Sequence, residues 1–118
     1  MHFFRNLFLL TITLFLTLTL ASAEDKFGVK VYDGAKYDAE TTAVVSQMGG
    51  QAACYRSNDS LAKVLDFYKK LPGSTLIHMG EKGAYFKVNG ANVTVQSPWL
   101  NMKTDAQNTD TLISLVKN

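Results

Sequence analysis

The sequence predicts an α+β domain in which a mostly antiparallel sheet carries two helices on one face. Segments with alternating apolar residues come before and after two segments with helical spacing of apolar residues. Gly49-Gly50 and Pro72-Gly73 end the helical segments, and Asn89-Gly90 lies between two extended segments. Helices that cover one face of an antiparallel sheet are typical of α+β folds. The predicted order of elements is β-α-β-α-β-β-β-β.

Residues 1–23 have the layout of a secretory signal peptide. Arg5 supplies a positive charge, residues 7–20 form an apolar run interrupted only by threonines, and an A-x-A motif ends at Ala23. The apolar run is shorter than the about 20 residues that a membrane span needs. We therefore expect cleavage after Ala23, a secreted or periplasmic location without stable membrane insertion, and a single small domain over residues 24–118.

The composition of the mature chain argues against several classes of function. Charges of both signs are interspersed, and the formal net charge of +2 falls to +1 once Arg5 is removed. Nucleic-acid and anionic-membrane binding both need clustered basic residues, so we expect neither partner. Cys54 is the only cysteine and His78 the only histidine after residue 23. No internal disulfide is possible, and these ligands are too few for structural zinc, so we expect no metal and no cofactor.

The first predicted strand begins at Phe27, where apolar residues alternate until the Asp33-Gly34 turn. The first helix follows over residues 38–50. Asp38 is a good N-cap residue, and Gly49-Gly50 ends the helix. Its apolar stripe is predicted to consist of Thr41, Val44, Val45 and Met48.

A short strand is predicted over residues 51–56, followed by the most strongly periodic helix over 57–73. Ser57, Asn58 or Asp59 is expected to cap this helix. The apolar stripe comprises Leu61, Val64, Leu65 and Tyr68.

The next three strands are predicted to form a meander whose register follows from its turns. A two-residue turn at Asn89-Gly90 pairs the residues on either side of it, and a four-residue turn is predicted over 80–83. The expected opposing pairs are Val88 with Ala91, Phe86 with Val93, Ala84 with Val95, Met79 with Ala84 and Ile77 with Phe86. The other face of the sheet then carries His78, Tyr85 and Thr94 in a row.

Residues 110–118 fit either a strand or a short helix. Thr111, Ile113 and Leu115 alternate as in a strand, whereas Thr109 or Asp110 could cap a helix. We favour the strand because the run is short and rich in β-branched residues.

The segments VKVYDGAKYD (29–38) and ACYRSNDSLAKVLDFYKK (53–70) resemble a broad group of small exported bacterial domains. The pattern of that group begins roughly V-x-V-Y-P-G-A, continues with a short strand and a Thr/Asp-Ser-capped helix ending F-Y-K, and closes with a β-meander. The likeness covers most of residues 29–96, with Asp33 in place of the proline and Ser57 in place of the threonine. It implies an α+β fold and export, and it assigns no chemistry and no functional residue.

Two sets of residues are candidates for binding. Trp99 follows Pro98 at the end of the meander. It either anchors a partner from a loop or covers one end of the core, and we favour packing. His78, Tyr85 and Thr94 either line a shallow polar ligand site or form the solvated side of the sheet, which is the usual situation.

Cys54 allows three interpretations. It is a nucleophile with His78 as its base, an intermolecular thiol, or a small buried apolar residue. We favour burial if the first helix covers the side of the strand on which Cys54 lies.

Together these observations predict an exported, non-enzymatic domain that recognises a protein or a small ligand. A structural subunit that associates through an edge strand or Cys54 is the first alternative, and a thiol enzyme using Cys54 and His78 is the second. A monomer and a homodimer both remain open.

Overall fold

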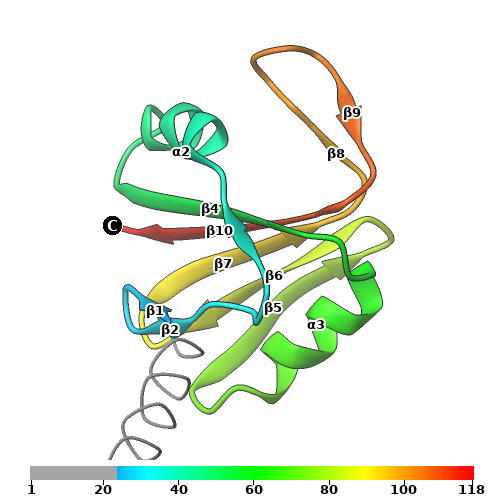
Figure 1. Cartoon of the computed structure of the whole chain (residues 1–118). Helices are drawn as coiled ribbons and strands as arrows, with labels where there is room; N and C mark the ends of the chain where they lie inside the picture. The colour runs from blue at the N-terminus through cyan, green and yellow to red at the C-terminus, as the bar shows by residue number, and fades with distance from the viewer. Residues whose placement is uncertain (1–23) are drawn as a thin grey trace, which may run out of the picture.

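The computed structural model describes residues 24–118, and the expected signal peptide lies outside the described residues. A six-stranded antiparallel sheet runs through the middle of the molecule (Figure 1). The helices are α2 (Ala39–Ser46) and α3 (Leu61–Lys70). The strands are β1 (Asp25–Lys26), β2 (Val29–Lys30), β3 (Lys36–Tyr37), β4 (Gln51–Ser57), β5 (Ser74–Gly80), β6 (Gly83–Val88), β7 (Ala91–Gln96), β8 (Trp99–Leu100), β9 (Gln107–Asn108) and β10 (Thr111–Lys117).

The strand order in the large sheet is β3-β4-β10-β7-β6-β5, and every neighbouring pair is antiparallel. The α+β class and its mostly antiparallel sheet are therefore confirmed, and the predicted order of elements holds in outline. The interpretation of the last element as a strand is also confirmed, because β10 pairs along its length with β4 and β7. In residues 24–118, neither helix is long and apolar enough to cross a membrane.

Two small hairpins accompany the large sheet. β1 and β2 pair around a turn at Phe27 and Gly28, where φ is 57° and 79°. The single strand predicted to begin at Phe27 is thus replaced by a tight turn and two short strands. β8 and β9 form the second hairpin, which was not among the predicted elements.

The two helices lie on opposite faces of the sheet, so the prediction that both cover one face is wrong (Figure 1). α3 packs on the face that carries Ala53 and Tyr55 of β4, whereas α2 packs over Cys54. Successive side chains of a strand point to opposite faces, so these neighbours belong to different layers. The Cys54 N–H donates to Thr42 Oγ1 at 2.8 Å, and Val45 packs against the Cys54 cluster. An apolar stripe shows that a helix packs on a sheet but does not select the face, which is why the sequence misled here.

Both helices begin with a side-chain cap. Asp38 Oδ1 accepts the Thr41 N–H at 3.0 Å, as predicted for the first helix. The second helix is capped by Ser60, which accepts the Lys63 N–H at 3.3 Å, and not by the three residues before it. α2 ends at Ser46, so Met48 falls outside the helix and is 62% exposed.

The β6–β7 register agrees with the prediction at every expected pair. Asn89 and Gly90 both have positive φ, 51° and 86°, as a two-residue hairpin turn with matching twist requires. β5 departs from the prediction because a bulge places Leu76, rather than Ile77, opposite Phe86.

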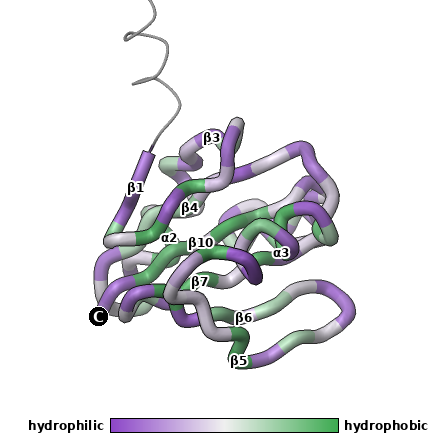
Figure 2. The backbone as a smooth tube through the Cα atoms, turned by 90° about the horizontal axis from the view of Figure 1, so that it is seen from below, coloured by the Kyte–Doolittle hydropathy of each residue, from purple (hydrophilic) through white to green (hydrophobic). Residues whose placement is uncertain are grey.

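Most of the core lies between the sheet and α3. Tyr68, Phe86, Ile113 and Leu115 are its largest fully buried side chains. Figure 2 shows hydrophobic stretches along the central strands β10 and β7, with hydrophilic residues in the outer turns. Tyr68 is polar at one end: its hydroxyl donates to Lys30 O at 3.1 Å and accepts the Tyr32 N–H at 3.2 Å.

We expect Tyr68→Phe to lower the free energy of unfolding by about 1–3 kcal/mol, because the Lys30 carbonyl and the Tyr32 amide lose their buried partner. Urea denaturation followed by Trp99 fluorescence measures the change. Tyr85→Phe is the matched control, since the Tyr85 hydroxyl is only part-buried and bonds one side chain, Asn92. Equal losses for the two variants would show that the Tyr68 hydroxyl does not hold the 30–32 segment.

Candidate functional site

Trp99 belongs to a second, smaller core on the α2 side of the sheet. It is 4% exposed and packs with Cys54 and Leu112, and Val45 of α2 covers the cluster. The prediction that Trp99 serves packing is therefore confirmed, and the indole is not displayed on a loop.

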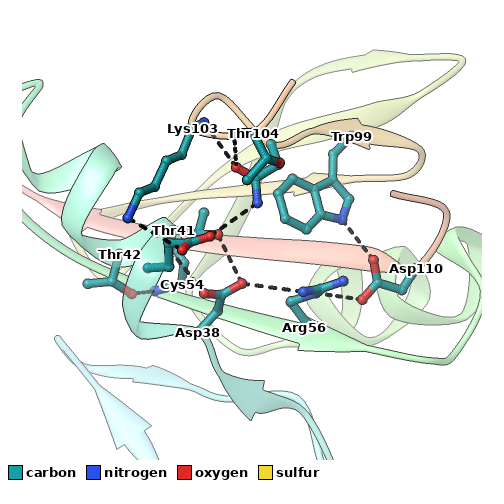
Figure 3. A network of polar contacts seen from close by, with 11 residues as sticks. Asp38, Thr41, Thr42, Cys54, Arg56, Trp99, Lys103, Thr104 and Asp110 are labelled. Carbon is teal, nitrogen blue, oxygen red and sulfur yellow. Dashed lines mark hydrogen bonds and ion pairs between the residues drawn. The ribbon is translucent and has the colours of Figure 1, made fainter. Parts of the chain in front are cut away.

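A network of polar contacts fixes the orientation of the indole (Figure 3). Trp99 Nε1–H donates to Asp110 Oδ1 at 2.9 Å, and the other oxygen of the same carboxylate accepts from Arg56 Nε at 2.7 Å. The Arg56 guanidinium lies over the indole ring, 5.1 Å from its centroid, and Arg56 Nη1 is 3.6 Å from Asp38 Oδ2. The hydrogen bond to Asp110 raises the pKa of Arg56 above its usual value. The cation is thus held over the indole by two carboxylates.

This network was not predicted, because the sequence analysis considers Asp38 and Asp110 only as helix caps. One signal was available. Arg56 alternates with Cys54 along β4, so it shares the face that buries Cys54. An arginine on a partly buried face needs carboxylate partners.

Trp99 is also the base of a projecting segment, residues 97–109, which we call the arm. The arm contains β8 and β9, and its tip is organised by Asn101, whose side chain accepts the N–H groups of Lys103 and Thr104 at 3.0 and 3.2 Å. Two contacts connect the tip to α2: Lys103 Nζ lies 3.5 Å from Glu40 Oε2, and Asn101 Nδ2 donates to Glu40 Oε1 at 3.5 Å. Both partners in the ion pair are about half exposed or more, so this connection is weak.

A groove lies between α2 and the arm, and we call it the α2–arm groove. Its more enclosed half is a cavity of about 330 Å³. Apolar side chains dominate this half, and Thr41, Gln96, Asn101 and Ser114 supply hydrogen-bonding groups. A shallower hollow of about 640 Å³ continues along α2, past Met48 and Lys103, and shares Val44 and Met102 with the first. The apolar side chains that line the enclosed half are Val44, Val45, Trp99, Leu100, Met102 and Leu112.

Two residues of the arm that line the groove are large, apolar and exposed without serving the core. Leu100 is 55% and Met102 60% exposed, both on the arm. The sequence analysis did not consider them for binding, because it treated only Trp99 in this segment as a candidate.

The predicted row of His78, Tyr85 and Thr94 is confirmed as a row by the pairing of β5, β6 and β7. The register extends it further: Thr94 pairs with Ser114, which pairs with Cys54. Ser114 also lines the α2–arm groove, so the row begins at the floor of the groove and runs outward to the edge strand.

The same row separates Cys54 from His78. The two residues lie on strands four neighbours apart, which is roughly 19 Å at the usual strand spacing. Cys54 is fully buried, its Sγ lies 3.6 Å from Ser114 Oγ, and burial raises the pKa of the thiol. A catalytic thiol needs the opposite shift and a base within reach. The interpretation of Cys54 as a small buried residue is therefore confirmed, and the structure does not bring the proposed nucleophile and base together.

Within residues 24–118, no three His, Cys, Asp or Glu side chains come close enough to hold a metal ion.

No family model, no curated protein and no solved structure matches the chain. The resemblance to small exported bacterial domains therefore stays a prediction, and the function has to be argued from the groove itself.

We expect Asp110→Ala to lower the free energy of unfolding by about 1–3 kcal/mol, because it leaves the buried indole N–H and one side of Arg56 without a partner. Trp99 emission should shift to the red as the arm loosens. Asp66→Ala, which breaks an exposed ion pair with Lys70, should change stability by less than about 1 kcal/mol and leave the emission unchanged. An unshifted spectrum in Asp110→Ala would show that apolar packing alone holds the arm.

Cys54 should react with a thiol reagent only as fast as the domain unfolds, because the thiol is fully buried and its pKa is raised. Reaction kinetics in increasing urea measure this dependence. Cysteine introduced at Ser46, which is exposed on α2, is the control and should react at once in native protein. Rapid native reaction at Cys54, or a dimer that reductant dissociates, would contradict the buried assignment.

Proposed function

We propose that the protein is an exported, non-enzymatic binding domain of the periplasm or the cell exterior. In this proposal the α2–arm groove holds a small ligand, or an apolar side chain of a partner protein. The observation that supports it best is the groove's composition: apolar side chains from α2, the arm and β10 surround a concavity of about 330 Å³, and a few hydrogen-bonding groups also line it. Ligand sites commonly have this size and this combination of lining groups.

The local architecture supports binding in a second way. The base of the groove is rigid, because Trp99 is buried and bonded to Asp110. The outer wall is less constrained. The polar contacts between the arm tip and α2 all go to one side chain, the Glu40 carboxylate. A fixed base with an adjustable wall admits a ligand without repacking the main core, which lies on the other side of the sheet.

Assembly through β5 is the second candidate function. β5 is an edge strand on which Leu76, Ile77 and Met79 are 43%, 52% and 42% exposed. An uncovered apolar edge strand is a common site of association between chains. The bulge between Leu76 and His78 works against it, because bulges interrupt the regular row of edge hydrogen-bonding groups.

One pair of matched variants distinguishes the two functions. We expect N-phenylnaphthylamine, an uncharged apolar dye, to bind the groove and to accept energy from Trp99, the only tryptophan. Leu100→Glu introduces a charge into the groove wall at a 55% exposed position and should weaken dye binding about tenfold, which corresponds to about 1.4 kcal/mol. Leu76→Glu makes the same change on β5 and should leave dye binding unchanged.

Size-exclusion chromatography of the same proteins tests assembly. A monomer that binds dye through Leu100 supports the binding proposal. A dimer that Leu76→Glu dissociates, with no dye binding by the groove, would replace it with the assembly role.

A further inference from the structure

The sheet face beside the α2–arm groove carries a lysine, and its strands contain no carboxylate. On the α2 side, β5, β6 and β7 present an open face that the helix does not cover (Figure 1). Lys87 lies there, and no Asp or Glu occurs within β5, β6 or β7. We call this surface the open face, and its residues are Thr75, His78, Tyr85, Lys87, Asn92 and Thr94.

Lys87 differs from Lys103, which lines the groove, and from Arg56, which lies beside Trp99. Arg56 is paired with Asp110 and Asp38, and Lys103 is paired with Glu40. Lys87 forms no ion pair with any part of the chain from residue 24 onward, so its charge is not compensated.

The groove and the open face are continuous. Ser114 lines the groove, and its neighbour across β7 is Thr94, followed by Tyr85 on β6. Two strand spacings separate Ser114 from Tyr85, about 10 Å. Tyr85 and Lys87 are two residues apart on β6 and therefore point to the same face, where the Tyr85 hydroxyl donates to Asn92 Oδ1 at 2.9 Å. Hydrogen-bonding groups and an unpaired cation thus lie close enough to the apolar groove for one small molecule to reach both.

We propose that the ligand of the groove is an anionic amphiphile, with its apolar chain in the α2–arm groove and its anionic head on the open face beside Tyr85, Asn92 and Lys87. The inference rests on the proposed function, since it names the class of ligand for the same groove. The apolar lining of the groove favours the hydrocarbon chain of the amphiphile. The uncompensated lysine, on strands without a carboxylate, selects a negative head over a positive one.

Three probes with the same chain test the head group: dodecanoate, dodecanol and dodecyltrimethylammonium, each below its micelle concentration. Displacement of N-phenylnaphthylamine from the full mature chain gives the three affinities. We expect dodecanoate to bind most tightly and the cation most weakly. Added salt should lower the affinity for dodecanoate until it approaches the affinity for dodecanol, because the contact with the head group is exposed to solvent.

Lys87→Gln locates the effect on the protein. This variant should lower the affinity for dodecanoate about threefold, the size expected for one exposed ion pair. The affinity for dodecanol should stay unchanged. Lys69→Gln removes the same charge from α3, on the opposite side of the sheet, and should change neither affinity.

The outcomes separate this inference from the proposal on which it rests. Dye binding that depends on Leu100 supports binding in the groove. If dodecanoate then binds no better than dodecanol, or Lys87→Gln has no effect, the proposal of an anionic head group is refuted. If neither the dye nor any of the three probes binds, both proposals fail.

Discussion

The pairing of β10 with both β4 and β7 is the interaction on which the rest of the structure depends. β4 carries α2 and β3, and β7 continues into the β5–β6–β7 meander. The last strand lies between these two halves and joins them into one sheet: Ser114 pairs with Cys54 on one side and with Thr94 on the other. Only then do Ile113 and Leu115 complete the main core while Leu112 completes the Trp99 cluster.

This dependence explains how much of the fold the sequence could predict. The β6–β7 register was predictable because it follows from a local cause, the Asn89-Gly90 turn. β10 was predictable as a strand from its alternation. Its central position was not, because the local sequence does not determine which strands pair with it. The faces of the helices were mispredicted for the same reason. α2 covers Cys54 and α3 covers Tyr55, and that assignment becomes fixed only when β4 is paired with β10.

The candidate site follows the same division. The row of His78, Tyr85 and Thr94 was predictable, because the turns that set it are local. The groove was not, because its walls come from α2, the arm and β10, which meet only in the complete sheet. The contact between Arg56 and Asp110 spans 54 residues in the sequence, and no spacing rule connects them. Alternation along β4 could have shown only that Arg56 needed a partner.

The position of the groove has a physical origin in the size of α2. A helix of eight residues is too short to cover one face of a six-stranded sheet, so part of that face needs other cover. The arm supplies it at one end, where Trp99 closes the small core over Leu112 and Cys54. Two separate covers over one face leave a gap between them. Val45, Trp99 and Leu112 border this gap and also form the small core, so that part of the gap is apolar. Beyond the arm the face remains uncovered and polar, which explains why an apolar groove lies next to a polar surface that carries Lys87. The amphiphilic ligand that we propose matches this face of the sheet, which is covered by apolar side chains at one end and open and polar at the other.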